Sequence, residues 1–206
     1  MRFDPSTLPA RDVYQLMIGL ITPRPIAWIS TLSAEGVPNL APFSFFSGVG
    51  ANPPTVVFSC VDRRDGTPKD TVRNLRVVPE FVVSAASFDQ RVAVNETSAE
   101  FDYEVDEFAA CGLTPVASEQ VRPPRVGESR AHLECVVHQI VRVGDGPLAA
   151  NLVIGRIVMV HADDAIVTAE GQIDAHKLDT IGRMGGASYA RTTELFELPR
   201  PSGVRR

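Results

Sequence analysis

The sequence predicts an all-β fold with a few helices, in which a closed antiparallel barrel has helices over its ends. Runs rich in β-branched and aromatic residues recur along the chain. They do not alternate regularly with helical patterns, as they would in a doubly wound parallel sheet. The 206 residues, 44% of them hydrophobic, are enough for a sizeable core. Since no repeat, low-complexity linker or shift in composition divides the chain, we expect one domain over 1–206, with arms or tails at 1–12 and 201–206.

The composition excludes several classes of protein. The formal net charge of −5 argues against a general nucleic-acid binder. The three cysteines, Cys60, Cys111 and Cys135, form no CxxC pair, so we expect reduced thiols and neither a disulfide framework nor a zinc site. The N-terminus lacks the basic and apolar regions of a signal peptide, and no apolar run approaches the roughly 20 residues that span a bilayer. We therefore expect a soluble cytoplasmic protein without a membrane partner.

The first half of the chain carries clear helix and strand signals. Helical spacing of apolar residues after Asp12 predicts a helix over 13–21, which ends before Pro23. Thr67 as N-cap and Pro68 as first helical residue predict a second helix over 67–76. Strand propensity predicts a hairpin with arms at 26–29 and 39–47, and strands over 55–61 and 80–86.

The second half is predicted to contain two long strands, over 131–143 and 151–161, with a bulge or a close approach at Gly155. The other expected elements are helices over 90–97 and 103–111, an ordered proline-rich loop over 113–130, a short strand over 166–168, a helical turn over 175–181 and a glycine-rich loop over 182–189.

The returning arm of the hairpin is unusual for a strand. It carries Pro42, small polar residues, and phenylalanines at 43, 45 and 46. Because proline gives up a ladder donor, such a strand often has a backbone that serves another partner. Our hypothesis is a planar ligand laid against this backbone. The period of two along a strand predicts Ser44 and Phe46 on the ligand side.

Two basic positions suit a phosphate or another anion. Lys69 and Thr71 lie at a predicted helix start, where free N–H groups and a partial positive charge favour anions. Asp70 competes for the same donors, and a capped surface helix with a solvated lysine is the alternative. Arg24 lies between two prolines that stiffen its backbone, which suits anion recognition, although a lone arginine is more often solvated.

No residue set for acid–base, nucleophilic or metal catalysis is recognisable. The four histidines lack metal-binding spacing, and the chain contains neither a nucleophile elbow nor a P-loop. The glycines at 182–186 do not form the dinucleotide fingerprint, and a surface loop and a ligand loop stay open as alternatives. An enzyme built this way needs a cofactor to carry its chemistry.

The segments ITPRPIAWISTLSAEGVPNLAPFSFFSGVGANPPTVVFSC, KDTVRN, EFVVS and GRMGGASYA, in this order, resemble the flavin reductase-like family of FMN-binding split barrels. The flavoredoxin-like branch is the most similar, and the resemblance spans roughly 10–200. It implies a six-stranded antiparallel Greek-key split barrel. It also implies a homodimer with FMN at the dimer interface.

The resemblance implies FMN contacts at twelve positions, with no catalytic residue and no metal assigned. They are Arg24, Lys69 and Thr71 at the phosphate; Asn39, Ala41, Pro42, Ser44 and Phe46 along the isoalloxazine edge; Ser59 and Cys60 on the ribityl or phosphate side; and Arg183 and Tyr189 over the flavin, from the same or the second subunit. Glu96 departs from the serine that is common in relatives.

The implied activity is hydride transfer from NADH or NADPH to flavin N5, followed by electron delivery to free flavin or to an electron-accepting protein. Backbone N–H groups near N1 are expected to stabilise the reduced flavin. Two alternatives stay open: an electron carrier without a nicotinamide site, and a barrel without flavin that acts as a binding module.

Overall fold

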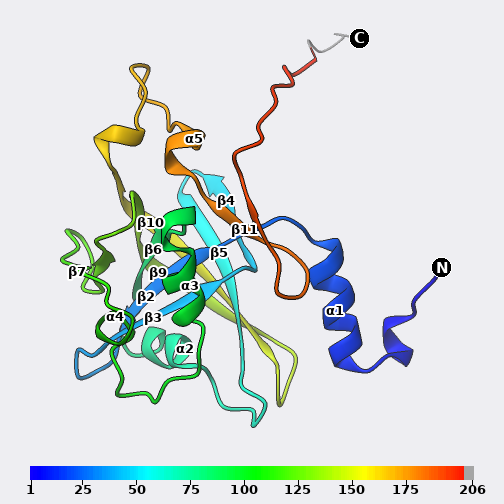
Figure 1. The fold of residues 1–206 in the computed structure, drawn as a ribbon. Coiled ribbons are helices and arrows are strands. Elements are labelled where there is room, and N and C mark those ends of the chain that lie inside the picture. Colours follow the sequence, from blue (N-terminus) through cyan, green and yellow to red (C-terminus); the bar gives the residue numbers. More distant parts are fainter. Residues whose placement is uncertain (202–206) are drawn as a thin grey trace.

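A seven-stranded antiparallel sheet forms the body of the computed structural model, which describes residues 1–201 (Figure 1). Its spatial order is β3-β2-β6-β9-β10-β5-β4. The strands are β2 (Ala27–Leu32), β3 (Pro38–Phe43), β4 (Phe46–Ala51), β5 (Pro54–Val61), β6 (Glu80–Ala85), β9 (Ala131–Val143) and β10 (Ala150–Ala162). Except for Pro201, the expected tail at 201–206 lies outside the described residues.

The two edge strands of this sheet, β3 and β4, are consecutive in the chain. Only Ser44 and Phe45 separate them, so the sheet must curl until its edges come close together. The predicted all-β barrel class is confirmed, but the sheet has seven strands where six were expected. The returning arm of the hairpin is two strands, because the chain leaves β2 after Phe43 and pairs with β5 on the opposite edge.

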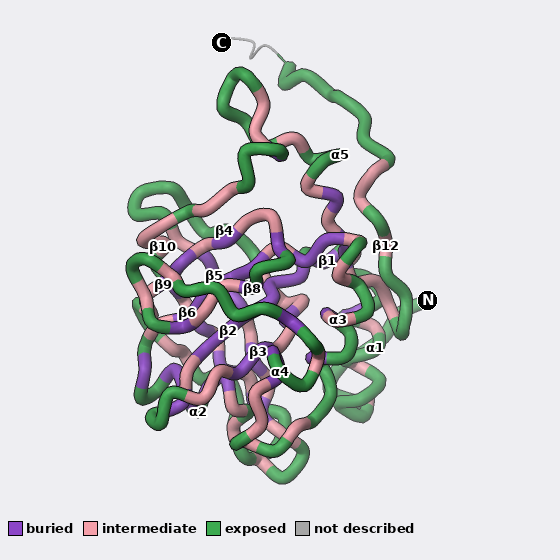
Figure 2. Tube along the Cα trace, turned by 60° about the vertical axis from the view of Figure 1, so that its left-hand side comes forward, coloured by how far each residue is buried: buried purple, intermediate pink, exposed green. Residues whose placement is uncertain are grey.

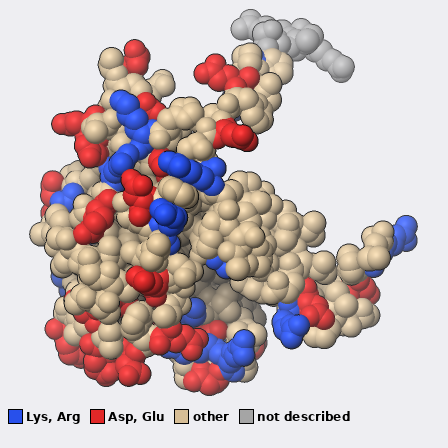
Figure 3. All heavy atoms as spheres, in the orientation of Figure 1, with Lys and Arg blue, Asp and Glu red and all other residues tan. Residues whose placement is uncertain are grey.

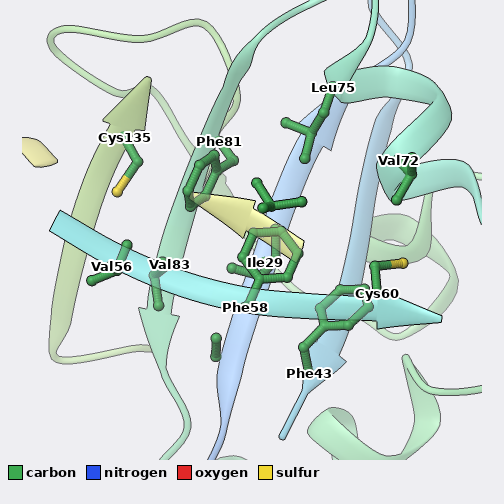
Figure 4. Close-up of a cluster of buried hydrophobic side chains, with 12 residues drawn as sticks. Ile29, Phe43, Val56, Phe58, Cys60, Val72, Leu75, Phe81, Val83 and Cys135 are labelled. Atoms are coloured by element: carbon green, nitrogen blue, oxygen red, sulfur yellow. The ribbon is translucent and has the colours of Figure 1, made fainter. Parts of the chain in front are cut away.

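The interior of the curled sheet is filled by apolar side chains from several strands (Figure 4). The Phe58 ring lies between Phe43 and Phe81, with ring centroids 5.1 and 5.4 Å away. Gly155 lies against the same core, since an added Cβ would stand 2.6 Å from Phe81 Cε1. The pairing of β9 with β10 also shifts register at this residue. Both predictions for Gly155, the bulge and the close approach, are confirmed.

The helices are short and lie around the sheet (Figure 1). They are α1 (Ala10–Leu20), α2 (Asp70–Leu75), α3 (Arg91–Glu96), α4 (Glu107–Ala110) and α5 (Ala175–Leu178), with 3₁₀ turns at Pro5–Thr7, Phe88–Gln90 and Asp164–Ile166. The helices expected over 13–21, 90–97 and 175–181 are confirmed, with α5 shorter than predicted.

The helix expected over 67–76 is present, but its predicted cap is wrong. Thr67 binds Asp65 through both its N–H and its hydroxyl, at 2.8 and 2.7 Å, so α2 begins at Asp70, two residues after the predicted first helical residue. The helix expected over 103–111 is a single turn. It starts at Glu107, because the Asp106 carboxylate accepts from the Phe108 N–H and caps it there.

Three other segments differ from expectation or refine it. The short strand expected over 166–168 is reduced to a single antiparallel bridge between Val167 and Ile173, because Asp163 caps a 3₁₀ turn that extends to Ile166. The glycine-rich loop is the tip of a hairpin of β11 (Ile181–Arg183) and β12 (Tyr189–Arg191), and β11 pairs with β1 (Arg24–Pro25). The proline-rich loop contains a small hairpin, β7 (Pro115–Val116) with β8 (Arg125–Val126).

Buried residues concentrate in the sheet, whereas α1 and the chain after β12 are mostly exposed (Figure 2). Positive and negative side chains are interspersed on the visible face, and the lobe around α1 and the neighbouring hairpin is mostly uncharged (Figure 3). Within residues 1–201, no helix is long and apolar enough to cross a bilayer.

Candidate functional site

The free edge of β3 is the centre of the candidate site. β3 pairs only with β2, and the Leu40 N–H points away from β2 to Glu107 Oε2 at 3.0 Å. In an antiparallel ladder the backbone groups of alternate residues point away from the partner strand, so the backbone N–H and C=O positions of residues 38, 40 and 42 point away from β2. Pro38 and Pro42 therefore cost no ladder bond, and the edge presents carbonyl oxygens. This edge therefore offers no free backbone N–H donor to a ligand, contrary to expectation, because two of the three residues are prolines and the Leu40 N–H binds Glu107.

The Asn39 end of β3 is tied to α2 by a buried polar network. Asn39 Nδ2 donates to the hydroxyls of Thr31 and Thr71, each at 3.2 Å. Asn74 Nδ2 donates to Thr31 at 3.1 Å, and Asn74 Oδ1 accepts from the Tyr103 hydroxyl at 2.9 Å. The structure thus brings the predicted residues Asn39 and Thr71 together. The Thr71 side chain is buried and serves this network, so it makes no contact with a surface ligand here.

Lys69 stands exposed at the start of α2, and among the described residues its ammonium makes no ion pair. The neighbouring Asp70 carboxylate is paired with Arg63 at 2.6 Å, and Arg63 also donates to the Pro68 carbonyl at 2.7 Å. Because Arg63 neutralises Asp70, the competition that the sequence suggested between Asp70 and a phosphate is reduced. Lys69 is left as the cation available to an anion at this end.

Arg24 binds the Ser44 end of β3 and is itself only 3% exposed. Its guanidinium donates to Ser44 Oγ at 3.2 Å and to the carbonyls of Ile18, Ile21 and Met184 at 2.7, 2.8 and 3.0 Å. Burial lowers the pKa of Arg24 from its ordinary value.

This placement corrects the predicted role of Arg24 at a phosphate. All three guanidinium nitrogens bind the protein, and Arg24 lies at the opposite end of β3 from Lys69. The five residue steps from Asn39 to Ser44 span about 17 Å at the rise of a strand. Arg24 therefore does not share a phosphate with Lys69 and Thr71 in this structure.

Arg183 and Tyr189 lie next to the Ser44 end. Arg183 is opposite Arg24 in the β1–β11 pair, and its guanidinium lies 4.4 Å from the centroid of the Tyr189 ring. The Tyr189 hydroxyl donates to Asn95 Oδ1 at 3.4 Å. The predicted Arg183 and Tyr189 are therefore side by side in one chain, near the C-terminal end of α3.

The remaining predicted residues divide by burial. Ala41, Pro42, Phe46 and Ser59 are half-buried. Cys60 has no exposed surface, and burial raises the pKa of its thiol to about 12. Its side chain belongs to the core, so the expected ligand contact of Cys60 is not made by the thiol.

Glu107 is a site residue that the sequence reasoning missed. It is 6% exposed, and burial raises the pKa of its carboxyl to about 7. Asp70 and Asp106 lie nearby and raise it further, whereas the Leu40 N–H lowers it. The segment DEFAAC (residues 106–111) carried a signal for it. Asp106 is a typical helix N-cap, and Glu107 directly after it points into the protein.

A separate cavity of about 430 Å³ opens on the other side of β1 and β11. Pro25 and Gly182 line it, and among the predicted residues it includes only Phe46. Its lining is largely apolar and reaches His132 and His161. Burial lowers the pKa of His132 to about 4. None of the described residues forms a cluster of metal ligands.

Comparison with known proteins finds a matching family and similar proteins of nearly the same length. The sequence model of the family described as "Flavin reductase like domain" matches residues 19–175. Protein BH2278 of Halalkalibacterium halodurans is 40% identical over 204 residues, which cover 98% of this chain and 97% of that protein.

Solved structures extend the likeness to the fold. Nitrilotriacetate monooxygenase component B from Bacillus cereus is 38% identical with a TM-score of 0.91, over 96% of this chain and 98% of that one. The 2-nitrobenzoate 2-nitroreductase NbaA of Pseudomonas fluorescens is 26% identical with a TM-score of 0.88, over 100% and 99% of the two chains.

Proposed function

The chain belongs to the flavin reductase-like family, and from this premise we propose that it is an NAD(P)H-dependent flavin reductase that holds FMN along the free edge of β3. One observation carries the proposal. An unpaired strand edge of about 17 Å runs from the side of α2 that carries the unpaired Lys69 to the hairpin that carries Arg183 and Tyr189. Glu107 of α4 covers this edge at Leu40, whereas Ala41, Pro42 and Ser44 are half-buried and can lie against a flat ring. The distance from there to Lys69 suits an extended phosphate-bearing chain.

The donor set of the protein fits FMN in this direction. Lys69 suits the phosphate, since an ammonium–phosphate hydrogen bond is among the stronger polar contacts. The outward carbonyl of the half-buried Pro42 suits the single ring N–H of an isoalloxazine. Small side chains at Ala41 and Ser44 leave room for a flat ring close to the backbone.

When bound, FMN supplies the N5 atom that accepts a hydride from NADH or NADPH before electrons pass to free flavin or an electron-accepting protein. The chain's own share is to bind and orient. Ser44 is held by Arg24, and the paired Arg183 and Tyr189 stand where they limit access of water to the ring end. No acid or base of the chain is needed for this role.

The proposal also covers the domain organisation, the oligomeric state, the cellular location and the electron-accepting partner. We take residues 1–206 as one domain that works as a homodimer, with a second copy completing the flavin site. The three cysteines are free thiols, which supports a reducing, cytoplasmic location. The likeness to a protein named as a monooxygenase component supports electron delivery to a separate partner.

The test is anaerobic reduction of the purified protein with FMN. We expect NADH or NADPH to bleach the flavin absorbance, and the faster nucleotide identifies the donor. Bound FMN that neither nucleotide reduces indicates an electron carrier instead. Absence of FMN binding indicates a flavin-free module and overturns the proposal.

The phosphate assignment has its own test. Lys69→Ala should weaken FMN binding by about 10- to 100-fold, because a charge-assisted hydrogen bond is worth roughly 1.5–3 kcal/mol. Lys177→Ala is the matched control, since Lys177 lies on α5 and its ammonium pairs with Asp174 at 3.9 Å. Fluorescence quenching of FMN measures both affinities. Equal affinity in Lys69→Ala and Lys177→Ala contradicts the assignment.

A further inference from the structure

Helix α1 contacts the rest of the chain through its C-terminal turn and through Tyr14, whose ring centroid lies 6.5 Å from that of Phe45. Arg24 binds the carbonyls of Ile18 and Ile21, and Gly185 packs against Gly19. Ile18 is the single buried residue of the helix, while Met17 is 43% and Leu20 81% exposed. An isolated helix of this length is marginal in water, and an apolar stripe normally faces a packed surface.

The chain after β12 forms a second exposed apolar element, which we call the C-terminal arm (residues 192–201). It has no regular secondary structure and stands off the body in two views (Figures 1 and 2). Phe196 is 83% and Leu198 81% exposed. Leu195 is also 52% exposed, so the arm presents three apolar side chains within four residues.

The exposed area of the chain is too large for a compact monomer. The surface is 12461 Å², whereas a compact protein of 22.3 kDa exposes about 9,400 Å². The excess of about 3,000 Å² is well above the roughly 800 Å² that each partner buries in a standard interface. Both α1 and the C-terminal arm protrude from the body of the sheet (Figure 1).

We infer that the C-terminal arm of one protomer packs on the exposed apolar face of α1 in a second copy, and that the second arm does the same in return. Within one chain the arm leads away from the body, so it does not cover its own α1 (Figure 1). A two-fold pair satisfies both surfaces with one kind of contact and closes without further copies.

The inference rests on the homodimer of the proposed function and names the elements that build it. The arm follows β12 directly, and β12 begins with Tyr189. The same hairpin touches α1 through Gly185. An exchange of arms therefore joins each candidate flavin site to the second copy.

The experiment compares two double variants with the wild type by sedimentation velocity. Phe196→Ser with Leu198→Ser disrupts the arm, and Met17→Ser with Leu20→Ser disrupts α1. Each double variant removes four apolar side chains from the contact surface of the dimer, so it should weaken dimerisation by at least about 100-fold. Val77→Ser, at a residue that is 62% exposed beside α2, is the control and should leave the dimer intact.

Mixing the two double variants tests whether the contact is reciprocal. The mixture restores one intact arm on one intact α1, so heterodimers should form more readily than either variant dimerises alone. Circular dichroism checks that each variant is folded. A monomeric wild type, or two double variants that dimerise like the control, overturns the inference.

FMN affinity measured on the same samples separates the two claims. A wild type that binds no FMN but shows the expected dimer behaviour contradicts only the proposed function. A wild type that is reduced by NAD(P)H with FMN, while both double variants dimerise normally, contradicts only the arm exchange.

Discussion

Replacing the buried Glu107 by glutamine should stabilise the protein at neutral and alkaline pH. Glutamine keeps an oxygen that accepts the Leu40 N–H, but it never carries a charge. The folded environment raises the pKa of Glu107 to about 7 from a reference of 4.5, chiefly through burial. In the folded state the neutral form of the acid is therefore favoured over the carboxylate.

The size of the effect follows from the shift in pKa. The stability cost of Glu107 is absent below pH 4.5, grows between pH 4.5 and about 7, and is constant above that. At about 1.4 kcal/mol per pH unit, the full cost is on the order of 3 kcal/mol. For a chain of this size, Glu107→Gln should raise the melting temperature at pH 8 by about 6–12 °C.

Thermal unfolding followed by circular dichroism at pH 4 and pH 8 is the assay. We expect equal melting temperatures at pH 4 and a clear gain for Glu107→Gln at pH 8. A gain of equal size at both pH values, or no gain at pH 8, refutes the reasoning, because neither outcome depends on ionisation.

Glu80→Gln is the matched control with the opposite sign. A hydrogen bond from Arg122 lowers the pKa of Glu80, so its contribution is present at pH 8 and is lost as pH falls through the folded pKa. Because the Arg122 side chain is 59% exposed, we expect Glu80→Gln to cost less than about 1 kcal/mol at pH 8.

Three further predictions follow from the core and the site. Gly155→Ala should destabilise the protein by about 1–3 kcal/mol, because the added methyl group overlaps the buried Phe81 ring; urea unfolding measures this, and an unchanged midpoint contradicts it. Arg24→Met should increase hydrogen exchange in both α1 and residues 184–188, because one guanidinium holds both; an increase in only one segment argues against that role. Iodoacetamide should label Cys111 before the two fully buried core cysteines, and mass spectrometry of the native protein checks the order.

The fold was largely predictable because its signals are local. The long strands at 131–143 and 150–162 alternate in character and end at turn residues, so their bounds came out within a residue. The start of α2 was not predictable in the same way. Thr67 is a good N-cap in isolation, but Asp65 two residues earlier binds it more directly.

The candidate site was less predictable because it depends on contacts between distant segments. The pairing of Asn39 with Thr71 joins residues 32 apart, and the binding of Glu107 to Leu40 joins residues 67 apart. Arg24 illustrates the limit best. Its flanking prolines indicated a fixed guanidinium, but only the packing of α1 and of the β11–β12 hairpin shows which groups it binds.

Arg24 joins three parts of the molecule that have different tasks: the bend after β3, the end of α1, and the β11–β12 hairpin. A ligand that orders Ser44 should therefore also order α1. By thermodynamic reciprocity, a second copy that orders α1 should increase the affinity for that ligand by the same factor. If the proposed flavin site and the proposed exchange of arms both hold, the affinity for flavin should fall as the protein is diluted and the proposed dimer dissociates.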